Sequence, residues 1–261
     1  MSEGPQVKLR TEWLDRYLSG RRLVSCTTTK PELECAAAEA TGKRVLRCFC
    51  KGKHICIELQ GGLCFHNHLL MRGKWRRVTG EFLLLSHQVW LALCVGEHTV
   101  YNVNGQVLEA VTAEEVRGIF DSLGPDVMAR PFPRAAIRAA LKESTIPVAE
   151  ALLKQGVVSG IGNVAKSEIL YAARIDPSCR ACALSSEQLD ALLGAMRSVM
   201  WDSYRTGGRW IHKVYRRAGK PCLACGAPIQ MLRLAPSRRS IYSCPRCQCN
   251  HRQPELFTDG L

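Results

Sequence analysis

Two pairs of cysteines near the end of the chain constrain its fold more than any other feature. Cys222 and Cys225 form one Cys-x-x-Cys pair, and Cys244 and Cys247 form a second pair after eighteen intervening residues. Each pair supplies two thiolates from one tight turn, and two facing turns complete a tetrahedral site of four sulfurs. Gly226 follows the first pair directly, where a glycine lets the backbone turn tightly. The spacing predicts one structural zinc ion, Zn2+, held by these four cysteines.

The segment between the two pairs predicts a β-hairpin with a basic tip. Apolar and β-branched residues at 229–234 and 240–243 flank a turn that contains Arg238 and Arg239. From residue 203 to residue 253 the chain carries eleven lysines and arginines and no acidic residue. A zinc-bound hairpin with this charge is typical of a surface that contacts nucleic-acid phosphates. A zinc site that only holds the C-terminus together, or that binds a protein, is the alternative interpretation.

The length and charge of the chain limit the classes of protein to which it belongs. Its 261 residues suffice for one or two domains with hydrophobic cores, and its formal net charge is +13. We find no apolar run long enough to span a bilayer and no secretory signal at the start. We therefore expect a soluble intracellular protein with no membrane partner, located in the cytoplasm or nucleoid, or in the nucleus of a eukaryote.

The remaining cysteines are expected to be reduced, because the chain has no secretory signal. Most of them lie in apolar runs, where a cysteine behaves as a small buried hydrophobic residue. Cys179 and Cys182 form a third Cys-x-x-Cys pair without an obvious partner pair. We interpret this pair as structural rather than redox-active or metal-binding.

The hydrophobic pattern of residues 1–124 predicts a β-rich domain. Apolar residues recur at helical spacing up to Gly20, where a glycine favours the end of a helix. Alternating and β-branched segments follow to about residue 110, and Gly61-Gly62 fits a two-residue hairpin turn. We expect an antiparallel β-sandwich flanked by helices. The expected strands are 23–26, 44–49, 54–59, 63–66, 82–85, 89–95 and 99–103.

From Thr112 the pattern becomes helical, so that the whole chain is predicted to be an α+β multidomain protein. Thr112 and Glu115 form a capping box, and prolines and glycines at 123–133 indicate a hinge between domains. A glycine-rich connection then leads to a helix that begins near Asn163, with its N-terminal N–H groups available to an anion such as phosphate. A plain helix cap at Asn163 is the alternative. The expected helices are 134–143, 147–155, 163–173 and 186–205.

Several motifs occur in an order that resembles the formamidopyrimidine-DNA glycosylase and endonuclease VIII family over nearly the whole chain. The motifs are Glu3-Gly4-Pro5, Gly160 to Val164 with Glu168 to Leu170 downstream, Val214 to Cys222, and Cys244 to Gln248. The resemblance implies a bifunctional DNA glycosylase and abasic-site lyase of base excision repair, which acts on double-stranded DNA containing oxidised bases or abasic sites. It also implies a helix–two-turn–helix DNA-binding domain at 125–212 and a four-cysteine zinc finger at 213–253.

The resemblance further assigns roles to individual residues. Ser2, which follows the initiator methionine, matches the amine nucleophile, and Glu3 matches the catalytic carboxylate that moves protons. Lys53 matches a lysine of the catalytic site that contacts phosphate beside the lesion. Asn163 and Arg239 match an asparagine and a finger-tip arginine that bind backbone phosphates. Met71 lies, with its two preceding leucines, where the family places residues that fill the gap left by the displaced base.

Ser2 stands where most members of the family have proline. A primary amine also forms a Schiff base once Met1 is removed, and an N-terminal amine with a pKa near ~8 attacks the sugar more readily than a lysine at ~10.4. We therefore expect an amine-catalysed reaction. A proline iminium favours successive β and δ eliminations, and for this primary amine both that outcome and a stop after β elimination stay open. If Met1 is retained, the nucleophile is absent, and the protein is a catalytically silent protein that binds lesions or abasic sites.

The short segment between residues 203 and 215 resembles the endonuclease VIII branch, because the purine-specific branch has a longer loop here. This resemblance favours oxidised pyrimidines or abasic sites as substrates and a monomeric enzyme. A glycosylase for single-stranded or crosslinked DNA is a further alternative, since some relatives with a non-proline terminus have that activity.

Overall fold

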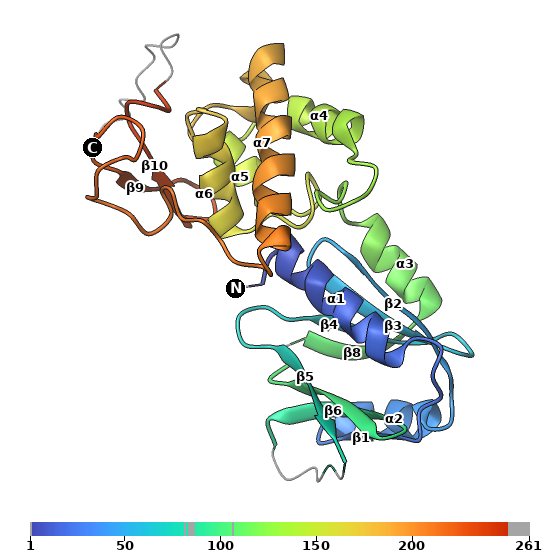
Figure 1. Cartoon of the computed structure of the whole chain (residues 1–261). Coiled ribbons are helices and arrows are strands. Elements are labelled where there is room, and N and C mark those ends of the chain that lie inside the picture. Colours follow the sequence, from blue (N-terminus) through green and yellow to red (C-terminus); the bar gives the residue numbers. More distant parts are fainter. Residues whose placement is uncertain (1, 81, 83–86, 106, 250–261) are drawn as a thin grey trace.

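The computed structural model describes residues 2–80, 82, 87–105 and 107–249. Residues 83–85 of the strand expected at 82–85 lie outside the described residues, and so do residues 250–253 of the expected zinc finger. Figure 1 shows a β-rich half formed by the first part of the chain and a helical half that carries a small hairpin. This arrangement confirms the predicted α+β fold with antiparallel sheets.

Two four-stranded antiparallel sheets form the β-rich half. One sheet has the order β1-β6-β7-β5 and the other has the order β2-β3-β4-β8. Their strands are β1 (Ser25–Thr28), β2 (Val45–Lys51), β3 (His54–Leu59), β4 (Leu63–His68), β5 (Lys74–Thr79), β6 (Val89–Val95), β7 (His98–Val103) and β8 (Val107–Thr112). Phe65, Trp75 and Leu91 are buried in their shared core together with Val7 and Leu14 of the first helix, α1 (Gly4–Leu18).

Four elements of this half have no counterpart among the predicted ones. The short helix α2 (Glu34–Ala40) follows the 3-10 turn η1 (Pro31–Leu33), and β5 and β8 each complete the edge of a sheet. In β5, Trp75 is the one fully buried side chain of a strand that also carries Lys74, Arg76 and Arg77. A strand this polar lacks the alternating apolar pattern, and its partner strand determines its conformation. The capping box at Thr112 and Glu115 begins α3 (Ala113–Asp121) as predicted.

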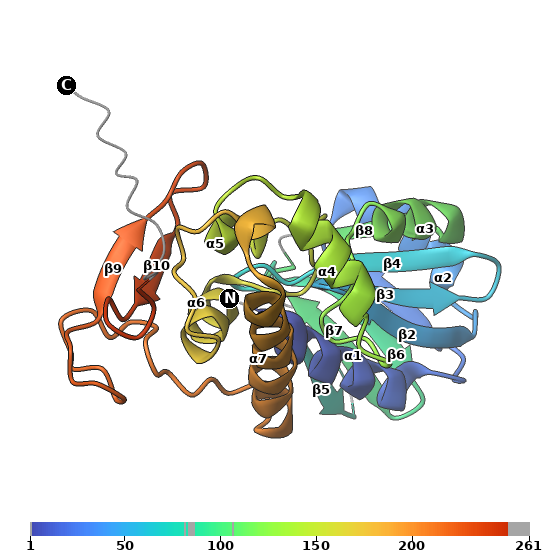
Figure 2. The same ribbon diagram turned by 90° about the horizontal axis from the view of Figure 1, so that it is seen from above.

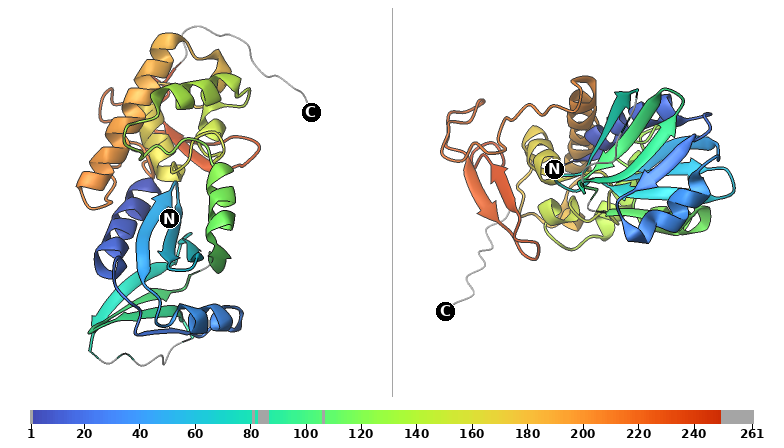
Figure 3. Two further views of the ribbon diagram at one scale, coloured as in Figure 1. Left: turned by 90° about the vertical axis from the view of Figure 1, so that its right-hand side faces the viewer. Right: turned by 90° about the horizontal axis from the view of Figure 1, so that it is seen from below.

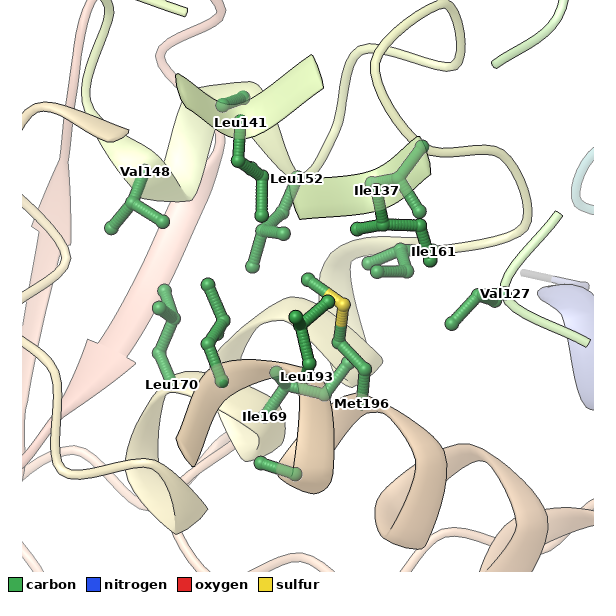
Figure 4. Packing of buried hydrophobic residues seen from close by; sticks show 14 of the residues in the cluster. Val127, Ile137, Leu141, Val148, Leu152, Ile161, Ile169, Leu170, Leu193 and Met196 are labelled. Carbon is green, nitrogen blue, oxygen red and sulfur yellow. The ribbon is translucent and has the colours of Figure 1, made fainter. Parts of the chain in front are cut away.

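The helical half packs around one hydrophobic core. Its helices are α4 (Arg134–Glu143), α5 (Val148–Ala151), α6 (Asn163–Ala172) and α7 (Ser186–Arg205), and a 3-10 turn, η2 (Ala181–Ala183), precedes α7. Figure 4 shows this core, in which Leu141 of α4, Leu152 at the end of α5 and Ile169 of α6 pack with Leu193 and Met196 of α7. None of the described helices is both long enough and apolar enough to cross a bilayer.

The predicted hairpin is present as β9 (Gln230–Arg233) and β10 (Ser240–Ser243). Ile241 of β10 belongs to the helical core, and Ile229 packs with Tyr171 of α6 and with Val214. Figure 2 shows the hairpin beside α6, and Figure 3 shows the chain's N-terminus close to where the two halves meet. The fold therefore brings the start of the chain, α6 and the hairpin to one place.

Candidate active site and metal centre

The carboxylate of Glu3 lies at the N-terminus of α6. Its Oε2 accepts hydrogen bonds from the N–H groups of Gly162 at 3.1 Å and Ala165 at 3.0 Å, and its Oε1 accepts one from Val164 at 2.9 Å. The side chain is fully buried. The sequence predicts an anion such as phosphate at this helix end. In the structure the anion is the carboxylate of Glu3, which belongs to the chain itself.

Glycines make this contact sterically feasible. A Cβ on Gly162 would lie 2.5 Å from Oε1 of Glu3, so a larger residue would collide with the carboxylate. The N–H of Gly4 donates to the carbonyl of Gly160 at 2.8 Å, and Gly160 has a φ of +98°. The N–H of Glu3 donates to Oε1 of Gln6 at 3.0 Å. The glycine-rich connection therefore receives the N-terminal end of α1.

The environment of Glu3 acts on its pKa in two directions. Burial raises the pKa of this carboxyl above its ordinary value, while the three N–H donors and the ammonium of Lys53 act to lower it. A buried carboxyl whose pKa is raised in this way is a candidate for exchanging protons with a reacting group.

Lys53 lies in the turn between β2 and β3, beside the helical half. Burial lowers the pKa of its ammonium to about 8, the carboxylate of Glu3 opposes this change, and the positive charge of Arg239 adds to it. The preceding Gly52 has a φ of +60°, and its N–H donates to the carboxylate of Asp126 at 3.0 Å. The turn is thus fixed against the helical half, and the ammonium of Lys53 interacts electrostatically with both Glu3 and Arg239.

Ser2 and Met71 lie next to this centre. The backbone N of Ser2 donates to the carbonyl of Leu70 at 3.2 Å, and Leu70 has a φ of +45°. The side chain of Met71 is 71% exposed. The loop that carries Met71 therefore contacts the start of the chain.

A cavity of about 560 Å³ connects most of the expected site residues. Glu3, Met71, Asn163 and Arg239 line it, whereas Ser2 and Lys53 are not among its lining residues. The cavity is also lined by three aromatic residues that the sequence did not single out as functional, namely Trp210, His212 and Tyr215. Their position next to the Val214 to Cys222 motif is the sequence signal that could have indicated them, and Trp210 also packs against the helical core.

Asn163 is the first residue of α6 rather than its cap, which corrects the expectation of a plain helix cap. Gly162 is the N-cap, and Nδ2 of Asn163 donates instead to Ser240 Oγ at 3.3 Å. Oδ1 is buried and has no hydrogen-bond partner among the described residues. If the amide is rotated by half a turn, Oδ1 accepts from the Ser240 hydroxyl and the NH2 group is directed towards the other side, available to an acceptor.

Glu168, farther along α6, is a second buried carboxylate with a structural role. It accepts hydrogen bonds from the N–H groups of Lys213, Val214 and Tyr215 at 2.8–3.1 Å. It thereby fixes the segment that leads from the cavity to the first cysteine pair.

The four expected metal ligands lie together at the base of the hairpin. The Sγ atoms of Cys222, Cys225, Cys244 and Cys247 all lie within 4.8 Å of one another, with 3.9 Å between Cys222 and Cys247 and 3.4 Å between Cys225 and Cys244. Zinc–sulfur bonds of about 2.3 Å in a tetrahedron require sulfurs about 3.8 Å apart. Four thiols with this spacing can hold a metal ion, and zinc fits the all-sulfur donor set.

Comparisons with known proteins agree on one family. The model of the formamidopyrimidine-DNA glycosylase N-terminal domain matches residues 1–101, and the model of the formamidopyrimidine-DNA glycosylase H2TH domain matches residues 123–214. The chain is 28% identical to endonuclease 8 of Klebsiella pneumoniae over 264 residues, which covers 95% of this chain and 100% of the relative. It is also 28% identical to the formamidopyrimidine-DNA glycosylase of Dinoroseobacter shibae over 283 residues, with the same shares.

A solved structure has the same fold over almost the whole chain. It is Lactococcus lactis formamidopyrimidine-DNA glycosylase bound non-covalently to DNA that contains an abasic site. The TM-score is 0.84 at 25% identity, and the match covers 95% of this chain and 100% of the other.

Proposed function

The chain belongs to the formamidopyrimidine-DNA glycosylase and endonuclease VIII family of DNA-repair glycosylases, and from this premise we propose that it is a bifunctional glycosylase and abasic-site lyase. The observation that carries the proposal is the buried Glu3 carboxylate on the N-terminus of α6, directly adjacent to Ser2 and within the field of Lys53. This arrangement places an amine and a cation next to a proton carrier, Glu3, that lines the cavity.

The proposed reaction begins when the target nucleotide leaves the base stack and enters the cavity. With Met1 removed, the uncharged amine of Ser2 attacks the sugar C1′, the glycosidic bond breaks, and the base leaves with a proton. Protonation of O4′ and cleavage of the C1′–O4′ bond then open the sugar to an iminium. The iminium acidifies the hydrogen on C2′, so that loss of this proton and of the 3′ phosphate cleaves the strand. Glu3 carries the protons during opening of the sugar and elimination.

Positive charge around the cavity supports a role in phosphate binding. Besides burial, the positive charge of Arg239 lowers the pKa of the Lys53 ammonium, and the carboxylate of Glu3 opposes this change. We propose that Lys53, Asn163 and Arg239 bind successive phosphates of duplex DNA, with the strand kinked at the displaced nucleotide. Met71, exposed at the rim, is proposed to fill the gap in the stack.

We propose oxidised pyrimidines as the main substrates, because the segment between 203 and 215 is short and its aromatic residues line the cavity. The proposed structural cofactor is one zinc ion at the four cysteines, and the proposed active form is a monomer. A silent abasic-site-binding protein is the second candidate, favoured by the serine that replaces the usual proline.

Borohydride trapping on a duplex with one abasic site tests the proposal. The intact mass of the same protein sample establishes whether Met1 has been removed. We expect a covalent adduct that maps to Ser2. A sample shown to lack Met1 that binds abasic DNA tightly but gives no adduct would favour the silent binding protein.

Arg239→Ala is expected to weaken binding of all lesion duplexes by about tenfold, since one charge-assisted phosphate contact is lost. The slope of log K against log salt concentration should fall in magnitude by about 0.9. Fluorescence anisotropy titrations between 50 and 200 mM KCl measure both quantities. A loss confined to one lesion type would contradict a phosphate contact.

Removal of the metal with a chelator is expected to abolish DNA binding while the sandwich remains folded. The cysteines lie at the base of the hairpin that carries Arg239, and thiolates without a metal do not hold this segment together. The measurements are metal content, DNA binding and hydrogen–deuterium exchange of the sandwich strands β3 and β6. Unchanged DNA binding by protein that has lost all its metal would contradict the need for a metal-held hairpin in DNA binding.

A further inference from the structure

Two buried charged residues of the helical half do not line the cavity and were not expected from the sequence. Glu150 in α5 is 4% exposed, and Lys166 in α6 is fully buried. Burial of a charge is unfavourable unless hydrogen bonds and an opposite charge compensate it. Burial lowers the pKa of Lys166 to about 8, and the carboxylate of Glu150 counteracts that effect. We therefore expect hydrogen bonds from these two side chains to other parts of the fold that compensate the loss of hydration.

Both side chains bind the turn at the tip of the hairpin. The carboxylate of Glu150 accepts from the hydroxyl of Ser237 at 2.8 Å and from its N–H at 3.2 Å. The ammonium of Lys166 donates to the carbonyl of Ser240 at 3.2 Å. Between these two points, the hydroxyl of Ser237 accepts from the N–H of Arg239 at 3.3 Å. One end of the turn is thus held by an anion and the other by a cation.

We propose that Glu150 and Lys166 are positioning residues that fix the 237–240 turn and thereby direct Arg239 towards the phosphate it binds. The role of Arg239 rests on the proposed function, whereas the fixing of the turn does not. Residues 235–239 are exposed, so they have little packing of their own to hold them. A turn fixed before DNA arrives loses less conformational entropy on binding, and Arg239 then contributes more to the affinity.

Hydrogen–deuterium exchange of the protein without DNA tests whether the turn is fixed. In Glu150→Gln and Lys166→Met, amides of 237–240 should exchange about tenfold faster than in the parent protein. Lys142→Met is a matched control, because Lys142 also donates to a backbone carbonyl, that of Leu184, but far from the hairpin. Metal content and melting temperature identify any variant that fails to fold, and Lys166→Arg should restore slow exchange. Unchanged exchange of the turn in folded Glu150→Gln would overturn the proposal.

A double-mutant cycle on a duplex with a stable abasic-site analogue tests the link to Arg239. Arg239→Ala should weaken binding about tenfold in the parent protein but only about twofold in Glu150→Gln, because an unfixed arginine contributes little. A full tenfold loss in both backgrounds would show that Glu150 acts independently of Arg239 and would overturn the positioning role. If the parent protein does not prefer abasic DNA at all, the proposed function fails, and the exchange measurement still decides whether the turn is fixed.

Discussion

Glu3→Gln is expected to reduce base excision by about 10²–10⁴-fold, the usual contribution of a general acid or base. The substitution keeps the size of the side chain but removes its ability to carry a proton. Single-turnover excision on a duplex with one oxidised pyrimidine measures the loss. Affinity for a duplex with an abasic-site analogue should remain within about twofold, because the buried carboxylate does not contact phosphate in the proposed complex. Unchanged excision would remove Glu3 from the mechanism.

The same substitution should also lower the free energy of unfolding by about 1–3 kcal/mol. Three backbone N–H groups donate to the carboxylate, and an amide nitrogen cannot accept from them. Glu168→Gln is the matched control, because Glu168 also accepts from three backbone N–H groups and is also buried. It should lose comparable stability while retaining excision within about tenfold. Equal losses of excision in both variants would mean that stability, not proton transfer, explains the result.

The parts of the site that are local in sequence could be predicted from the sequence. Two tight turns of the Cys-x-x-Cys type determine the metal ligands almost by themselves, and the hairpin follows from the apolar segments between them. The capping box at Thr112 and the repeat of apolar residues in α7 are equally local. In each case the residues that make the feature lie within a few turns of chain.

The contacts that assemble the site join distant segments, and the sequence did not predict them. Glu3 meets Gly162 across 159 residues of chain, and Glu150 meets Ser237 across 87. A helix N-terminus attracts any anion, so the sequence could indicate an anion there but not which one. Likewise, the pattern of α5 predicts only a buried face, and a carboxylate on that face has no partner until the hairpin is placed. The resemblance supplied roles for Glu3 and Arg239, while the positions of both depend on the tertiary fold.

Gly162→Ala is expected to reduce excision by at least about 10²-fold, although no reacting group is changed. The added Cβ would lie 2.5 Å from Oε1 of Glu3, so the carboxylate must move away from the three N–H groups. A displacement of about 1 Å is enough for a loss of this size, since proton transfer requires close alignment. Crowding in this buried place should also lower the free energy of unfolding by about 1–3 kcal/mol. Single-turnover excision and thermal unfolding measure the two effects.

Gly194→Ala in α7 distinguishes a collision at Glu3 from a general effect of losing a glycine. An added Cβ at Gly194 meets no atom within 4 Å, and alanine favours the helical conformation of α7. The free energy of unfolding of this variant should therefore rise by about 0.5–1 kcal/mol, and its rate of base excision should be unchanged. A third variant, Gly162→Ala combined with Glu3→Gln, should excise no more slowly than Glu3→Gln alone, because the glycine acts only through the carboxylate. A slower excision by the combined variant than by Glu3→Gln would mean that Gly162 also acts independently of Glu3, for example by contacting the DNA. Leaving room for the carboxylate would then be only part of its role.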